Sequence, residues 1–137
     1  MKIFISGDTP DGYVHSLIKR WGYESFNRLS NGYNSYSEGD IISNMKDADF
    51  AIFFISSKQK EKIGIRDHLT AYSLGVSSIS IILNSDRNIG ISENIYLLSD
   101  KILEEKNRID LRNGLKEFII KPPSKKERVS SSFKERY

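Results

Sequence analysis

Hydrophobic positions in the first part of the chain change their period twice, which predicts a strand, a helix and a second strand. The run "KIFIS" (2–6) is rich in β-forming residues and is followed at once by the turn-forming stretch "GDTPDG". Apolar residues then recur at helical spacing and draw one stripe, formed by Val14, Leu17, Ile18 and Trp21. Gly22 ends this helix, and "YESFNRL" (23–29) predicts an edge strand.

The middle of the chain continues the alternation. "GDIISNMKDAD" places Asp40 at the N-cap of a short helix that runs to about Asp47. "FAIFFIS" (50–56) has no polar alternation, as expected of a strand covered on both faces. "IRDHLTAYSLG" returns to helical spacing and ends at Gly75, after which "SISIIL" (78–83) predicts a further strand.

The last part of the domain is less regular. "IYLLS" (95–99) predicts a short strand, and residues 101–119 have helical composition with a break near Asn107. Strands that alternate with helices and read as apolar runs indicate a three-layer α/β domain, Rossmann-like or flavodoxin-like, with a mainly parallel sheet. Ligands bind such sheets beyond the carboxyl ends of the strands. The loops after the strands are therefore the places to look for chemistry.

Domain organisation follows from length and from the position of two prolines. A chain of 137 residues has the size of one domain with one core. We predict a single α/β domain over 1–119 and a tail over 120–137 that leaves it at Pro122 and Pro123. The tail carries six Lys and Arg against two Glu, a net charge of +4, which leaves −1 for the rest. Such a tail fits a solubilising extension, an arm that joins a homo-oligomer, or a contact with a polyanion such as nucleic acid.

Composition excludes several classes of site. The chain has no cysteine, which rules out disulfides, thiol catalysis and cysteine-bound zinc. His15 and His68 are the only imidazoles and lie far apart, so no metal site is expected. No apolar run approaches the ~20 residues that span a bilayer, and no secretory segment is apparent. We therefore expect a cytoplasmic protein without a membrane contact.

Glycine-rich phosphate loops are the usual first candidates in this fold class, but the first loop does not contain one. "SGDTPDG" offers only Gly7 and Gly12, and Asp8 and Asp11 place negative charge where a phosphate would bind. No bound cofactor is expected. Carboxylates remain as the candidate chemistry: Asp40 opens one helix, Glu61 lies in the loop after the central strand, and Asp67 starts the next helix.

The order and spacing of these acids resemble the small nucleoside 2-deoxyribosyltransferases and the related deoxynucleotide N-glycosidases. That family has an Asp opening a short helix, an Ala-Asp step into an apolar strand, an acid in the loop, and a catalytic Glu followed by Ala and Gly. In this chain Ala71 and Gly75 fall four and eight residues after Asp67. The resemblance covers residues 1–84 and implies cleavage or transfer at the N-glycosidic bond of a (deoxy)nucleoside or nucleotide.

The resemblance also implies roles for individual residues. Asp67 would stabilise or attack the sugar carbon, and Glu61 and Asp40 would orient the sugar or protonate the departing base. Ser6, Gly7, Tyr13 and Arg66 would bind the substrate, with Tyr13 stacked on the base. The family's nucleophile is Glu, so Asp67 is one methylene shorter. C-terminal residues of neighbouring subunits complete the family's sites, which implies an oligomer here.

Two alternatives stay open. "MKIFISGD", the amphipathic helix and "FFISSKQ" also resemble a TIR domain, which would process NAD at its nicotinamide–ribose bond. A non-catalytic module of the same fold could instead bind a nucleotide or a partner protein, with Asp67 capping its helix or paired with Arg66. An enzyme that hydrolyses or transfers at an N-glycosidic bond is the interpretation we carry forward.

Overall fold

The computed structural model describes residues 1–7, 11–27, 37–55, 61–83 and 98–121, with the backbone alone for 61–65. Within these ranges five strands form one sheet, and every pairing in it is parallel. The strands are β1 (Lys2–Ser6), β2 (Glu24–Asn27), β3 (Phe50–Ile55), β4 (Ser77–Ile82) and β5 (Lys101–Glu104). The helices are α1 (Tyr13–Arg20), α2 (Glu38–Asp47), α3 (Glu61–Ser73) and α5 (Arg108–Ile120).

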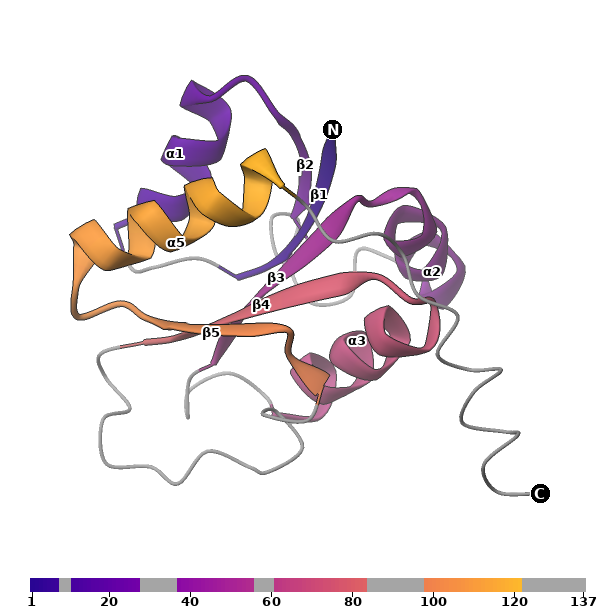
Figure 1. Cartoon of the computed structure of the whole chain (residues 1–137). Coiled ribbons are helices and arrows are strands. Elements are labelled where there is room, and N and C mark those ends of the chain that lie inside the picture. Colours follow the sequence, from indigo (N-terminus) through magenta and orange to yellow (C-terminus); the bar gives the residue numbers. More distant parts are fainter. Residues whose placement is uncertain (8–10, 28–36, 56–60, 84–97, 122–137) are drawn as a thin grey trace.

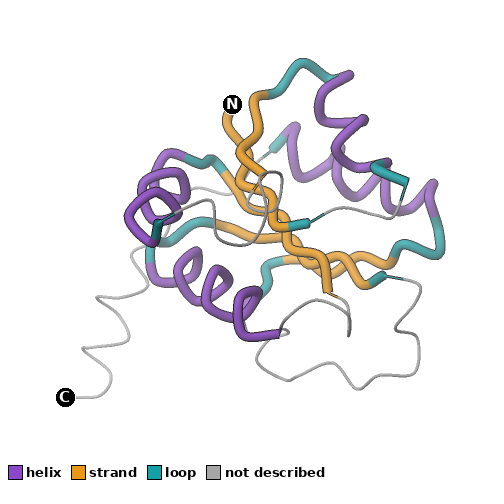
Figure 2. The backbone as a smooth tube through the Cα atoms, turned by 180° about the vertical axis from the view of Figure 1, so that it is seen from behind, coloured by secondary structure: helices purple, strands orange, loops and turns teal. Residues whose placement is uncertain are grey.

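Helices cover both faces of the sheet and form the two outer layers (Figure 1). Helices α1 and α5 lie together on one face, and α2 and α3 lie on the other (Figure 2). The α1–α5 core joins these helices to alternate strand positions: Ile3, Ile5, Val14, Ile18, Phe50, Ile52, Phe54, Ile79, Ile81, Leu83, Leu111, Leu115, Phe118 and Ile119. The α2–α3 core uses the other positions: Phe4, Ile41, Met45, Ala48, Ala51, Phe53, Ala71 and Val76. Because strand side chains alternate between faces, the continuous apolar runs supply both cores.

The strand order is β2-β1-β3-β4-β5, which is the flavodoxin-like arrangement. The chain moves outward from β1 to β2 and then returns past β1 to β3, β4 and β5. The order therefore reverses between β1 and β3, where Ile5 pairs with Ile52 and Ser6 with Phe53. The predicted three-layer α/β fold with a parallel sheet is confirmed, and its switch point lies between these two strands.

Two glycines end helices as the sequence predicted. Gly22 follows α1 with φ of 82°, and Gly75 follows α3 with φ of 74°. Both lie in the left-handed region, which glycine adopts without a steric penalty.

The predicted helix over 101–119 is wrong in its first part. Lys101–Glu104 is strand β5, whose residues pair in register with β4 from Ile79 to Ile82. Backbone pairing to an existing strand outweighs the helical composition of "KILEEK". The break expected near Asn107 is confirmed, because the Asn107 side chain caps α5 by accepting from Asp110 N at 3.1 Å. Of the predicted strand over 95–99, residues 95–97 lie outside the described residues, and Leu98 and Ser99 are not in a strand.

Candidate functional site

The carboxyl edge of the sheet gathers the ends of the strands and the first turns of the helices. Ser6 ends β1 and is 6% exposed, and Gly7 follows it with φ of 108°. Ser6 alternates with Ile5 and shares its face with Phe4, so it points toward the α2–α3 side of the sheet. These two predicted substrate-binding residues therefore lie beside the switch point, where ligands bind in open α/β sheets.

Asp40 is part of a helix cap. Helix α2 begins at Glu38, and its N-cap is Ser37 rather than Asp40. The Ser37 hydroxyl accepts from Asp40 N at 3.1 Å, and the Asp40 carboxylate accepts from Ser37 N at 3.3 Å. This reciprocal capping box satisfies two amide donors that the first turn leaves without helical partners. The predicted N-cap position was wrong by three residues, and the carboxylate that was predicted to be catalytic has a structural partner.

Helix α3 begins earlier than predicted. Glu61 is its first residue and not a loop residue, so Asp67 lies seven residues into the helix and not at its start. Gly64 interrupts the apolar pattern without interrupting the helix, at a typical cost of about 1 kcal/mol. A rise of 1.5 Å per residue places Asp67 about 9 Å along the axis from Glu61. Asp67 is therefore not an N-terminal cap of α3.

Asp67 is buried, with 5% of its surface exposed. It lies one helical turn before Ala71, which is fully buried in the α2–α3 core with Phe4 and Phe53. The same helical face therefore turns Asp67 toward the sheet. Side chains on a helix lean toward its N-terminus, which for α3 is the carboxyl edge of the sheet. A buried Asp is uncommon in proteins.

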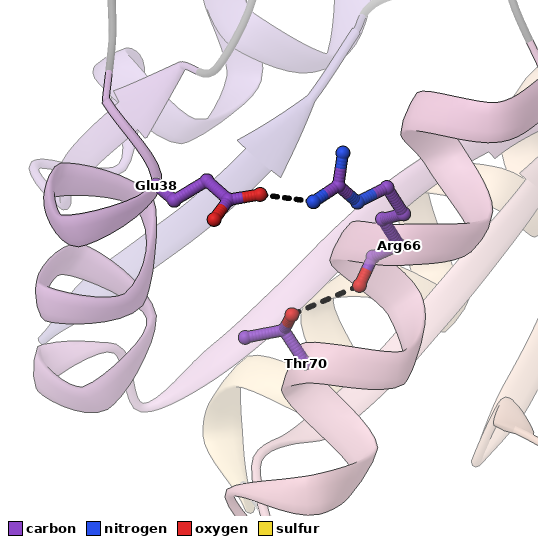
Figure 3. Close-up of polar contacts among 3 residues, drawn as sticks. All are labelled: Glu38, Arg66 and Thr70. Atoms are coloured by element: carbon purple, nitrogen blue, oxygen red, sulfur yellow. Dashed lines mark hydrogen bonds and ion pairs between the residues drawn. The ribbon is translucent and has the colours of Figure 1, made fainter.

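Arg66 joins two helices. Its guanidinium donates to the Glu38 carboxylate in the first turn of α2, as Figure 3 shows, and both side chains are largely exposed. The Thr70 hydroxyl donates to the Arg66 carbonyl oxygen at 2.9 Å within α3. An exposed ion pair of this kind contributes roughly 0.2–1 kcal/mol. The structure thus gives Arg66 a partner in α2.

Tyr13 contacts an arginine that the sequence did not single out. Arg108, the first residue of α5, lies over the Tyr13 ring at 4.4 Å from its centroid. The same guanidinium binds the Asp11 carboxylate at 2.8 Å and lies 3.9 Å from the buried Glu105. One face of the ring predicted to stack on a base is therefore covered by Arg108. The only local indication of these contacts in the sequence was a charged residue, Arg108, beside the break expected near Asn107.

A second cluster missed by the sequence lies under α3. The Nε2 atom of His68 lies 3.3 Å from Ser78 Oγ, 3.3 Å from Ser99 Oγ and 3.5 Å from Ser80 Oγ. The Ser80 and Ser99 hydroxyls are 2.6 Å apart, and the Ser78 hydroxyl donates to the Leu98 carbonyl oxygen at 3.2 Å. We call these four side chains the His68 cluster. Its signal in the sequence was the pair of serines at alternate positions, Ser78 and Ser80, in a strand that also contains Ser77.

Burial decides the state of the His68 ring. His68 is 2% exposed and stacks on Phe53, with 4.2 Å between ring centroids. Burial lowers the pKa of His68 from 6.5 to about 4, and the nearby Asp100 carboxylate partly opposes this by favouring the charged ring. The imidazole is therefore neutral at pH 7. Ser78 and Ser80 are also at most 1% exposed, so neither of these two hydroxyls is accessible as a nucleophile.

The described residues show neither a metal centre nor a membrane-spanning helix. No group of three or more His, Asp or Glu side chains among them is arranged to hold a metal ion. None of the helices within the described ranges is long and apolar enough to cross a membrane.

Of the predicted site residues, the structure brings Ser6, Gly7 and Asp67 to the α2–α3 side of the sheet or to its carboxyl edge. Asp40, Arg66 and Tyr13 are each engaged by a residue outside the predicted set, namely Ser37, Glu38 and Arg108. Glu61 opens α3, and its side chain lies outside the described part of the chain. The chemistry that this arrangement supports best is that of one buried carboxylate, Asp67.

Comparison by sequence finds no matching family model and no matching curated protein. Comparison by structure matches a solved 2-deoxyribosyltransferase from the psychrotolerant bacterium Bacillus psychrosaccharolyticus, with a TM-score of 0.59 and 14% identity over 80% of this chain and 90% of that one. At that identity the likeness concerns the fold alone. It confirms, at the level of the fold, the resemblance that the spacing around Asp67 indicated: the chain has the α/β architecture of a 2-deoxyribosyltransferase.

Proposed function

We propose that this protein hydrolyses or transfers at the N-glycosidic bond of a (deoxy)nucleoside or nucleotide, with Asp67 as the carboxylate that acts on the sugar. One observation carries the proposal. Asp67 is a buried acid, 5% exposed, on the sheet-facing side of α3 in a fold shared with a 2-deoxyribosyltransferase. Buried ionisable groups near the ligand-binding edge of an α/β sheet are frequent at functional sites.

The proposed chemistry uses the carboxylate in two steps. An Asp67 oxygen attacks the anomeric carbon as the bond to the base nitrogen breaks, and a general acid protonates the departing base. Water or a second base then attacks the same carbon and releases Asp67 as a carboxylate. The transition states have oxocarbenium character, which a nearby carboxylate stabilises.

The supporting roles are part of the proposal. Glu61, at the first turn of α3, is our candidate for the general acid. Asp40 would orient sugar hydroxyls through the oxygen that the capping box leaves available. Ser6 and Gly7 would contact the sugar at the end of β1, and Tyr13 would stack on the base. Arg66 would act indirectly, by holding α3 against α2 through Glu38.

Asp67 stands where the resemblance leads us to expect Glu. Its shorter side chain should lower the rate of the reaction. A carboxylate drawn back by about 1 Å loses on the order of 100-fold in rate. We therefore expect slow turnover in the natural protein and faster turnover in Asp67→Glu, which restores the longer side chain.

The test is chromatographic detection of free base from deoxynucleosides, deoxynucleotides and NAD. Asp67→Asn should abolish release, and Asp67→Glu should raise it. Asp47→Asn is the matched control, because it makes the same change at an exposed position at the far end of α2. Circular dichroism of each variant shows whether the fold is retained.

The pattern of release also separates the alternatives. Nicotinamide release from NAD, with none from deoxynucleosides, would favour the TIR-like activity. Absence of release from all three substrate classes by folded natural protein and folded Asp67→Glu would refute the enzymatic proposal and favour a binding module. A homo-oligomer formed through the tail stays a prediction, because residues 122–137 lie outside the described ranges.

A further inference from the structure

Four parts of the chain meet at one buried imidazole. His68 comes from α3, Phe53 from β3, Ser78 and Ser80 from β4, and Ser99 from the segment that enters β5. The ring stacks on Phe53 with an interplanar angle of 25° while its Nε2 atom faces the hydroxyls. One side chain therefore makes both apolar and polar contacts between α3 and the sheet.

The hydroxyls around the ring are themselves held by other groups. The Ser78 hydroxyl donates to the Leu98 carbonyl oxygen, so its oxygen is left to accept from the ring. In the tautomer with its proton on Nε2, the ring donates to Ser78; in the other tautomer, Nε2 accepts from Ser80 or Ser99. Ser78 is itself held on its backbone, since its N–H donates to Asp100 Oδ2 at 2.9 Å and its carbonyl oxygen accepts from Asp100 N at 2.9 Å. The serines form a fixed template for the orientation of the ring.

A rotation of α3 about its axis would carry the His68 ring away from the serines and from Phe53, which it contacts. Asp67 is its neighbour in sequence, about 100° away around the helix. Carboxyl atoms at the outer radius of a helix lie about 5–6 Å from the axis, so a rotation of about 10° moves them by about 1 Å. Displacement of a reacting group by 1 Å costs on the order of 100-fold in rate. A contact that fixes this rotation therefore matters to Asp67 although it does not touch the substrate.

We propose that His68 is a positioning residue: its hydrogen bonds to Ser78 and Ser99 and its stacking on Phe53 set the rotation of α3 and thereby the position of the Asp67 carboxylate. The proposal rests on the proposed function for its effect on rate. Its geometric part, the coupling of the His68 cluster to the environment of Asp67, stands without it.

The test compares two replacements of His68. His68→Phe keeps a ring against Phe53 and removes the nitrogen, whereas His68→Gln keeps an amide that can bond to the serines. The first readout is the ¹³C chemical shift of the Asp67 carboxyl by NMR, which does not depend on activity. The second is kcat and KM for base release, measured in the Asp67→Glu background where turnover is expected to be faster. His15→Gln, at an exposed position of α1, is the matched control.

We expect the Asp67 signal to move in His68→Phe and to return toward its natural position in His68→Gln. For the Asp67→Glu background we expect kcat to fall by about 100-fold in His68→Phe with little change in KM, and to recover in His68→Gln. His15→Gln should change neither readout. An unmoved Asp67 signal in folded His68→Phe, or an equal loss of kcat in both replacements, would overturn the proposal.

Two complications leave the test decisive. If His68→Phe does not fold, Ser99→Ala replaces it, because it removes one hydroxyl from the half-buried end of the cluster and leaves the ring in place. It should move the Asp67 signal in the same direction by less, and an unmoved signal would again overturn the proposal. If the natural protein and Asp67→Glu release no base, the proposed function fails, while the NMR comparison still decides whether His68 positions Asp67.

Discussion

Acidification should destabilise this protein through His68. The ring is buried and neutral in the folded chain, with a pKa of about 4, and it regains the ordinary value of 6.5 on unfolding. Between these two values the unfolded chain binds a proton that the folded chain does not. Stability is therefore fully present above about pH 6.5, declines as the pH falls, and stops declining from this cause below about pH 4.

The two pKa values of His68 determine how much the free energy of unfolding falls on acidification. A difference of about 2.5 units corresponds to about 3.4 kcal/mol in the free energy of unfolding, of which about 1.4 kcal/mol is already lost at pH 5.5. Globular domains are stable by only about 5–15 kcal/mol, so this single group removes a large part of the total. Because His68 is 2% exposed, solvent does little to screen the effect.

The assay is urea unfolding of the natural protein and His68→Gln at a series of pH values from about 7.5 to 4.5. Carboxylates titrate in both proteins, so the difference between their unfolding free energies isolates the imidazole. We expect the natural protein to lose about 2.5 kcal/mol relative to His68→Gln between the two ends of the series. A difference that stays constant across the series would refute the reasoning, because it would mean that His68 is protonated as readily in the folded chain as in the unfolded chain.

Further substitutions test the backbone and the packing of the described residues. Gly22→Ala should lower the free energy of unfolding by about 1 kcal/mol, because φ there is 82° and a side chain disfavours this left-handed backbone. An added Cβ meets no described atom within 4 Å, so the backbone is the only expected cause. An unchanged urea midpoint would contradict this. Ser77→Ala should raise the free energy of unfolding by about 1 kcal/mol, since the buried Ser77 hydroxyl has no hydrogen-bond partner among the described residues. Ser80→Ala should lower it by about the same amount, because the Ser80 hydroxyl is hydrogen-bonded to Ser99. Thermal unfolding that shifts in the same direction for both variants would be inconsistent with that account. Gly114→Ala would place a Cβ 2.7 Å from Leu103 Cδ2, so it should lower the free energy of unfolding by about 1 kcal/mol. In a Leu103→Ala background the same substitution should be stabilising, because the clashing atoms are gone. A double-mutant cycle without coupling would exclude the clash.

The sequence predicted the central elements well because their signals are local. "FAIFFI" is apolar enough to indicate a strand covered on both faces, "SISIIL" indicates a further strand, and the stripe from Val14 to Trp21 indicates its helix without tertiary information. The errors came where a local signal was weak or was overruled. Strand β5 has four residues of helical composition and exists because β4 pairs with it. The predicted helix began after Gly64, whereas α3 begins at Glu61 and continues through Gly64.

The candidate site was predictable as a set of residue types but not as a geometry. Ser37 and Asp40, three residues apart, already form a capping-box pattern in the sequence, which indicates a structural role for Asp40 beside the catalytic interpretation. The His68 cluster could not be found in this way. Its members are up to 31 residues apart, and only the docking of α3 on β4 brings them together.

The two outermost strands determine how the sheet meets other chains. β2 and β5 have four residues each, with Glu24 opening the first and Lys101 and Glu104 at the ends of the second. Between them lies β3, six residues without a charge, a segment of the kind that forms intermolecular cross-β aggregates when exposed. Short edges that carry charges are poor templates for the addition of a further strand. The native sheet thus keeps its most aggregation-prone segment two strands away from either edge, and loss of β2 or β5 would bring that segment closer to neighbouring molecules.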